Sequence, residues 1–180
     1  MKKIILTSAG FENKKIAFKF LELINLPAEK IKVLFITSAA VTNEQKAIIP
    51  LCHKELIDIG LKNFNIKYYD FEELINYENY DAIYVCGGST QSLLKKMKEN
   101  AFEHLLEKFL NKGGIYLGVS AGSIALAKNF PEGLGMLNCI LKVHSKENEK
   151  TEITQPLNQE IKINDNQAIV IEENKIYFFE

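Results

Sequence analysis

Short apolar runs rich in β-branched and aromatic residues alternate along the chain with longer segments of helical period. This alternation is typical of an α/β protein. Most of the runs are continuously apolar, as expected when helices cover both faces of a mainly parallel sheet. The candidate strands cover residues 3–8, 32–37, 66–69, 82–86 and 115–119.

Two longer segments predict helices. In residues 102–110, apolar side chains recur at spacings of three and four, which places them on one face of a helix. Asn100 and Glu103 are spaced like a capped start of that helix. Residues 43–59 predict another helix, in which Pro50 marks either a kink or a late start.

The pattern changes after residue 137, where only short strands are indicated. They cover residues 161–163, 168–171 and 175–179, and the last two predict an antiparallel hairpin. Taken together, the elements predict an α/β fold of three layers over residues 1–180, as a single domain. A mostly parallel central sheet has helices on both faces, and the C-terminal antiparallel hairpin closes the domain.

Composition adds few special constraints. The chain has 180 residues, of which 47% are hydrophobic and 25% charged, with a formal net charge of -1. Because the net charge is close to zero, nucleic acid is not an expected partner. The apolar run near the N-terminus is too short for a signal-peptide core, and no stretch is long enough to span a membrane.

Cysteine usage indicates a reducing compartment. Cys52, Cys86 and Cys139 lie far apart, show no Cys-x-x-Cys spacing and leave one over in any disulfide scheme. We therefore expect a cytoplasmic protein. The histidines and cysteines lack metal-ligand spacing, and neither G-x-G-x-x-G after the first strand nor a Walker A motif is present. No metal or cofactor is expected.

The main chemical signal follows the strand at 115–119. The sequence Gly118-Val-Ser120-Ala121-Gly122 matches a nucleophile elbow, in which a serine stands on a sharp strand-to-helix turn between two glycines. The amide of Ala121, at the start of the helix, can donate to an oxyanion. An ordinary turn is the alternative for so short a motif. Its place between a strand and a helix favours the elbow.

A second glycine turn follows the strand at 82–86. Gly87 and Gly88 end that strand, and Ser89 and Thr90 resemble a helix cap. In a parallel sheet this loop and the elbow lie at the same edge, where α/β proteins bind ligands. We expect Gly88 to supply a second oxyanion amide and the loop to contact substrate, with a plain capping loop as the alternative.

A nucleophilic serine needs a base, and the chain has three histidines. His53 and His104 lie in predicted helices and are interpreted as surface or packing residues. His144 follows an apolar run and precedes a polar loop, so a strand could deliver it to the edge that carries Ser120. It is the predicted general base, with a surface histidine as the alternative.

Two acidic residues are candidates for the group that orients the imidazole. Asp165 lies in the turn before the predicted strand at 168–171. Glu132 lies in a short Pro-Glu-Gly loop between Ser120 and His144. The sequence does not decide between them.

These motifs resemble those of the serine-peptidase family of peptidase E (aspartyl dipeptidase) and cyanophycinase, whose fold is similar to class I glutamine amidotransferases. The likeness spans nearly the whole chain. It rests on Ile-Leu-Thr-Ser, Gly-Gly-Ser-Thr-Gln-Ser-Leu-Leu, Gly-Val-Ser-Ala-Gly-Ser, Gly-Leu-Gly-Met-Leu and Asp-Asn-Gln-Ala-Ile. The resemblance implies Ser120 as nucleophile, His144 as base, an oxyanion amide at Gly88 and an acid at Asp165.

The chain also departs from that pattern. Relatives usually have a longer segment, containing an aspartate, where residues 129–132 stand here. All 22 basic residues are lysine, so no arginine can recognise an acidic substrate. The leading hypothesis is a serine hydrolase of peptidase E type that cleaves a short peptide or related small amide through an acyl-enzyme on Ser120, as a candidate homodimer. The alternative is a catalytically silent amidotransferase-like domain that binds a small ligand or protein partner.

Overall fold

The computed structural model describes residues 2–146, 160–172 and 175–180. Seven strands form the central sheet in the order β3-β2-β4-β5-β1-β8-β9. The first five strands in this order pair in parallel with one another. Strands β8 and β9 extend the sheet beyond β1 by antiparallel pairing. The strands are β1 (Lys3–Thr7), β2 (Val33–Ile36), β3 (Ile66–Tyr69), β4 (Ala82–Val85), β5 (Ile115–Val119), β8 (Ala168–Glu172) and β9 (Lys175–Phe179).

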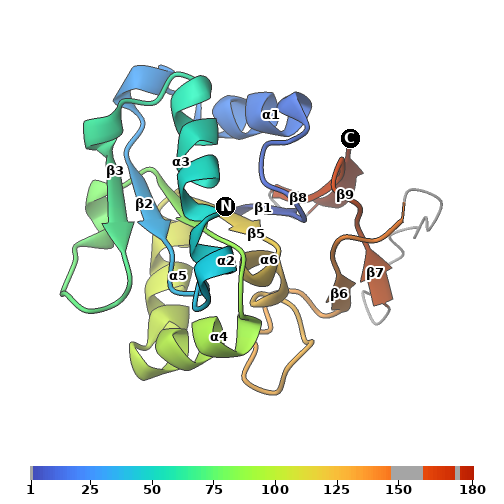
Figure 1. Cartoon of the computed structure of the whole chain (residues 1–180). Helices are drawn as coiled ribbons and strands as arrows, with labels where there is room; N and C mark the ends of the chain where they lie inside the picture. Colours follow the sequence, from blue (N-terminus) through green and yellow to red (C-terminus); the bar gives the residue numbers. More distant parts are fainter. Residues whose placement is uncertain (1, 147–159, 173–174) are drawn as a thin grey trace.

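Helices cover both faces of the sheet (Figure 1). Side chains alternate along each strand, so Ile5 faces one layer while Ile4 and Leu6 face the other. The layer with Ile5 contains α1 (Lys14–Ile24) and α3 (Ile49–Asp58). The opposite layer contains α4 (Thr90–Glu99), α5 (Phe102–Asn111) and α6 (Ala121–Ile124). This arrangement confirms the predicted fold of three layers.

A separate two-stranded sheet lies beside the C-terminal hairpin in Figure 1. It pairs β6 (Ile140–Lys142) in parallel with β7 (Glu160–Lys162). The prediction of a strand at 161–163 is confirmed within one residue. The antiparallel pairing of β8 and β9 confirms the predicted hairpin, and residues 173–174 lie outside the described residues.

The segment predicted as one helix over 43–59 forms two. The first is α2 (Asn43–Lys46), and α3 begins at Ile49 with Pro50 in its first turn. The first amides of a helix have no partner within it, so proline costs little there. The late start offered as one interpretation of Pro50 is therefore the one observed.

The predicted cap of the 102–110 helix is wrong. Ala101, in the left-handed conformation with φ 48°, precedes α5 and makes no side-chain cap. Asn100 belongs to the end of α4, where its side-chain amide donates to the Lys96 carbonyl at 2.9 Å. Only Asn100 and Ala101 join the two helices, and Asn100 caps the first of them, which leaves no room for a separate capping box.

A carboxylate is built into the packing between α3 and the sheet. Glu55 Oε2 accepts from the Phe11 amide at 3.0 Å and from the Tyr84 hydroxyl at 3.3 Å. Burial raises the pKa of Glu55 above its usual 4.5, although these two donors oppose part of the shift. Glu12 and Asp58 raise it further.

The raised pKa of Glu55 makes stability depend on pH. The folded state holds the proton more tightly than the unfolded chain, so ionisation of Glu55 destabilises the fold. Relative to Glu55→Gln, the wild type should therefore lose free energy of unfolding as the pH rises from 4.5 through the folded-state pKa. Urea denaturation of both proteins over an acid-to-neutral series checks this. Parallel pH curves would contradict it.

Candidate active site

Ser120 stands at the turn between β5 and α6, in the strained conformation φ 48°, ψ −104°. The turn is closely packed. A Cβ atom on Gly118 would lie 2.6 Å from the carbonyl carbon of Gly122, and one on Gly122 would lie 2.6 Å from the Val85 carbonyl oxygen. Neither position has space for a larger residue. The glycines on each side of Ser120 are therefore required by the geometry of the elbow.

Thr7, at the end of the neighbouring strand β1, anchors the elbow. Its carbonyl oxygen accepts from the Ser120 amide at 2.9 Å. Its amide donates to Ser123 Oγ at 2.9 Å, and the Ser123 hydroxyl is 2.7 Å from the carbonyl oxygens of both Thr7 and Gly118. Ser123 is fully buried. The sequence motif includes Ser123, but its anchoring role depends on β1 lying beside β5.

His144 reaches Ser120 from the edge of the two-stranded sheet. It follows β6 by two residues, and its Nε2 lies 3.1 Å from Ser120 Oγ. Asn129 holds the strand in place. Its side chain donates to the Leu141 carbonyl at 2.8 Å and accepts from the Leu141 amide at 2.9 Å. No local pattern assigns this role to Asn129, because its partner is known only once the chain folds back.

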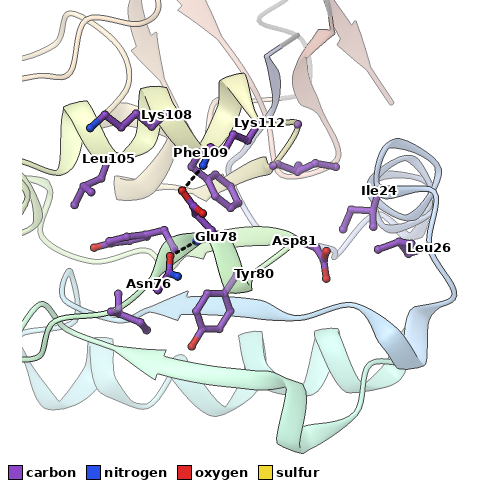
Figure 2. A pocket seen from close by; sticks show the side chains of 15 residues that line it. Ile24, Leu26, Asn76, Glu78, Tyr80, Asp81, Leu105, Lys108, Phe109 and Lys112 are labelled. Atoms are coloured by element: carbon purple, nitrogen blue, oxygen red, sulfur yellow. Dashed lines mark hydrogen bonds and ion pairs between the residues drawn. The ribbon is translucent and has the colours of Figure 1, made fainter.

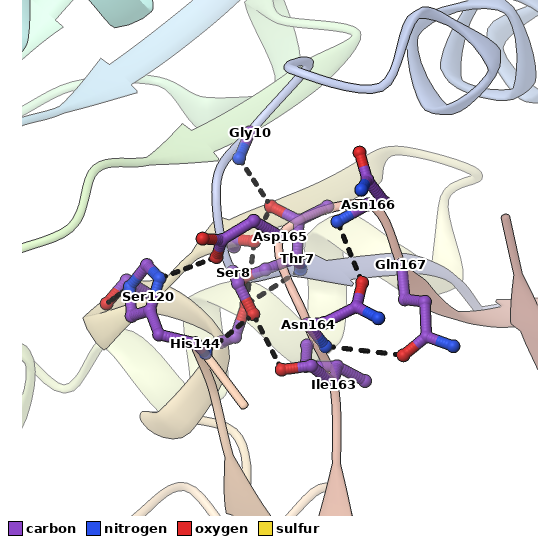
Figure 3. Close-up of polar contacts among 12 residues, drawn as sticks. Thr7, Ser8, Gly10, Ser120, His144, Ile163, Asn164, Asp165, Asn166 and Gln167 are labelled. Carbon is purple, nitrogen blue, oxygen red and sulfur yellow. Dashed lines mark hydrogen bonds and ion pairs between the residues drawn. The ribbon is translucent and has the colours of Figure 1, made fainter. Parts of the chain in front are cut away.

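The structure brings Asp165 to the other nitrogen of the imidazole. Asp165 Oδ1 lies 2.6 Å from His144 Nδ1 (Figure 3). The turn that carries Asp165 is held by its neighbours. Asn164 Oδ1 accepts from the Asn166 amide at 2.9 Å, and Asn13, the cap of α1, donates to the Asn166 carbonyl at 2.8 Å. The side chains of His144 and Asp165 are each about half exposed.

Glu132, the other candidate acid, lies elsewhere. It lines a cavity of about 400 Å³ over α4, together with Lys95, Lys98 and Phe130. Glu132 thus lies beside α4, whereas the His144 imidazole faces Asp165 in the turn before β8. Of the two acidic residues considered, only Asp165 is placed on His144.

The glycine loop after β4 lies against the nucleophile. A Cβ atom on Gly87 would be 3.2 Å from Ser120 Cβ. Gly88 has φ +141°, and a Cβ there would be 2.2 Å from the Ala39 carbonyl oxygen. Ser89 caps α4, as predicted, by accepting from the Ser92 amide. The loop therefore packs between Ser120 and the segment after β2.

A larger cavity lies at the opposite edge of the sheet. Its volume is about 450 Å³, and Figure 2 shows it between α5, the turn Tyr77–Asn79 and the end of α1. Asp81 and Ile115, at the amino ends of β4 and β5, line it. Ser120 lies at the carboxyl end of β5, so this cavity is not part of the serine site.

The family model of peptidase family S51 matches residues 4–134. This is well over half of the chain and includes the glycine loop and the elbow. The chain belongs to peptidase family S51. The predicted family and the predicted serine-type peptidase are both confirmed. His144 and Asp165 lie beyond the matched residues of this S51 peptidase, so their placement rests on the structure alone.

Two solved structures share the fold of this S51 peptidase. A protein of Listeria monocytogenes EGD-e described as a peptidase E is 22% identical, with a TM-score of 0.77, and the match covers 99% of this chain and 98% of that one. A peptidase from an acI-B1 Actinobacterium is 16% identical, with a TM-score of 0.64, covering 95% and 83%. A comparison with curated proteins found no match.

The other candidate reactive residues of the S51 peptidase are two histidines and Cys86. His53 on α3 contacts the Tyr68 hydroxyl at 2.6 Å, and His104 lies on the exposed side of α5. Cys86 is buried before the glycine loop, and burial raises the pKa of its thiol, which disfavours a reactive thiolate.

Within the described residues, no cluster of three or more histidine, cysteine or acidic side chains could hold a metal ion. No described helix is long and apolar enough to cross a membrane.

The anchoring of the elbow predicts a cost for Ser123→Ala. The substitution leaves the buried Thr7 amide without its acceptor, so the free energy of unfolding should fall by about 1–3 kcal/mol. Chemical denaturation measures the change.

Ser38→Ala is the matched control for Ser123→Ala. The Ser38 hydroxyl is also buried but has no hydrogen-bond partner among the described residues. Its removal should leave stability unchanged or slightly higher. Equal destabilisation by the two variants would contradict the anchoring role of Ser123.

Proposed function

We propose that this S51 peptidase is a serine hydrolase that cleaves a short peptide or related small amide through an acyl-enzyme on Ser120. The observation that carries the proposal is the linear arrangement of Ser120, His144 and Asp165. The Ser120 hydroxyl lies 3.1 Å from one imidazole nitrogen, and the Asp165 carboxylate lies 2.6 Å from the other. Both distances are within hydrogen-bonding range.

In the proposed mechanism, Asp165 selects the tautomer of the base. A carboxylate at Nδ1 accepts the N–H there, which leaves the lone pair of Nε2 facing the Ser120 hydroxyl. As Ser120 Oγ bonds to the substrate carbonyl carbon, the hydroxyl proton passes to Nε2. The imidazolium then gives that proton to the leaving amine as the C–N bond breaks. Water hydrolyses the resulting ester by the reverse transfers and restores the serine.

The amides of Gly88 and Ala121 are the proposed oxyanion donors. Gly87 lies directly against Ser120, and Ala121 is the first residue of α6. The next amide of the loop, on Ser89, donates to the Ala39 carbonyl at 2.7 Å and is engaged there. Gly88, between Gly87 and Ser89, is therefore the proposed loop donor. One such donor is typically worth about 100- to 1000-fold in rate.

The catalytically silent alternative rested on the short segment between the elbow and His144. That segment nevertheless returns through Asn129 and β6 and brings the imidazole within hydrogen-bonding distance of Ser120. In the proposal, Asp165, which follows His144 in the chain and contacts its Nδ1, takes the part of the acid that relatives carry in this segment. The short segment therefore no longer argues for a catalytically silent domain. If Ser120 proved unreactive, the hypothesis of a silent domain would be supported again.

Gly87, Ser89 and Thr90 are the proposed loop contacts for substrate, since the loop borders Ser120. The absence of arginine leaves only lysine to pair with a substrate carboxylate, as a point charge rather than a planar fork. The three cysteines are unpaired and buried, which is compatible with the proposed cytoplasmic location. A homodimer also stays a prediction.

A fluorophosphonate probe tests the nucleophile without knowledge of the substrate. The wild type should be labelled, Ser120→Ala should not be, and His144→Ala should react at a much lower rate because the hydroxyl loses its base. Mass spectrometry of the labelled peptide checks the site. A wild type that remains unlabelled would support the silent domain instead.

The acid is tested by comparing Asp165→Asn with Glu132→Gln. Asparagine can present an N–H to the imidazole, favour the wrong tautomer and lower the labelling rate by about 100-fold or more. Glu132→Gln should react like the wild type, because Glu132 lies over α4. If both variants changed the labelling rate equally, or if Asp165→Asn reacted like the wild type, Asp165 would have no role in the mechanism.

A further inference from the structure

One buried hydroxyl touches both segments that carry the proposed base and acid. Ser8 follows the last residue of β1 and is 1% exposed. Its Oγ accepts from the His144 backbone amide at 3.0 Å and donates to the Ile163 carbonyl at 3.1 Å. Figure 3 shows Ser8 between the two segments, with dashed lines to each. A hydroxyl has one proton to donate and lone pairs to accept, so both bonds can form at once.

The two partners of Ser8 lie where small displacements matter most. His144 itself has a positive φ of 54°, a conformation that a non-glycine residue adopts only when its surroundings hold it there. Ile163 stands two residues before Asp165 in the chain. The segments also bond to each other, since the Ser145 amide donates to the Ile163 carbonyl at 3.1 Å. Ser8 therefore links this pair of segments to the central sheet.

The residue before Ser8 holds the nucleophile. The Thr7 carbonyl accepts from the Ser120 amide at 2.9 Å, whereas the Ser8 hydroxyl accepts from the His144 amide at 3.0 Å. Consecutive Cα atoms are fixed at about 3.8 Å by the trans peptide bond. The Thr7–Ser8 unit therefore sets the position of the nucleophile relative to the base.

We infer that Ser8 is a positioning residue that sets the His144 imidazole against Ser120 and aligns Asp165 with it. The inference rests on the proposed function of Ser120, His144 and Asp165. Ser8 touches no reacting atom in this role. It acts by holding the backbone of the base, so its loss slows proton transfer and leaves the binding surface intact. Misplacing a catalytic group by about 1 Å can cost about 100-fold in rate.

The test compares Ser8→Ala with the wild type in the kinetics of fluorophosphonate inactivation. The inactivation rate constant at saturating probe should fall by about 10- to 100-fold. The probe concentration that gives half-maximal inactivation should hardly change, because the probe-binding surface is not altered. A purely structural role would lower the melting temperature without this split between rate and binding. An unchanged rate constant in folded Ser8→Ala would overturn the inference.

Ser38→Ala is the matched control for Ser8→Ala. Both serines stand in the sequence Thr-Ser-Ala at the carboxyl end of a strand of the central sheet, β1 or β2. The Ser38 hydroxyl is buried but has no hydrogen-bond partner in the described part of the chain. Ser38→Ala should keep the wild-type rate constant. An equal loss in both variants would show that the hydrogen bonds of Ser8 are not the cause.

Ser8→Cys covers the case in which alanine weakens folding. Its side chain is close to that of serine in size, but a thiol is a weak donor and acceptor, so the rate constant should again fall. A wild-type rate in Ser8→Cys would overturn the inference. The outcome is separable from that of the proposed function. If Ser120→Ala abolishes labelling while both Ser8 variants react normally, only the role of Ser8 fails; if Ser120→Ala still reacts, the proposed nucleophile fails.

Discussion

Parallel pairing of β1 with β5 places Thr7 opposite Val119. Because of this register, the Thr7 carbonyl meets the amide of Ser120 at the first residue beyond the strand. The chain must then turn at once, and the turn closes only because Gly118 and Gly122 have no side chains to separate them. A slip of one residue would exchange the two faces of the strand and move the serine away from the sheet edge.

The same strand end also locates the other two members of the site. Thr7 pairs on its far side with Ala168 at the start of β8, which fixes where the preceding turn carries Asp165. Ser8 then reaches the backbone of His144. Three segments distant in sequence therefore all contact Thr7, the last residue of β1, or Ser8, which follows it. The arrangement explains how β6 and β7, which make up a small separate sheet, can contribute to a site on the central one.

The sequence predicted the parts of this structure that depend on local pattern. Continuous apolar runs located the parallel strands, and a motif of five residues located the elbow. Asn100 was misassigned as a cap because its spacing suits either end of a helix, and only the left-handed Ala101 decides between them. The choice between Asp165 and Glu132 was open because it depends on how β8 pairs with β1. Asn129 and Ser8 carry no local signal, since each acts on a partner that folding brings to it.

The exposure of the imidazole and carboxylate limits what their mutual attraction can do. The side chains of His144 and Asp165 are each about half exposed, and even a fully charged pair in such surroundings contributes only roughly 0–1 kcal/mol. Strained conformations such as those of Ser120 and His144 typically cost about 1–3 kcal/mol each. The attraction alone is too weak to hold both residues in place. The geometry must therefore come from buried or partly buried hydrogen bonds to the backbone, which water screens less: Thr7 to Ser120, Asn129 to β6 and Ser8 to His144. The catalytic groups can then face solvent and substrate while these hydrogen bonds to the backbone set their positions.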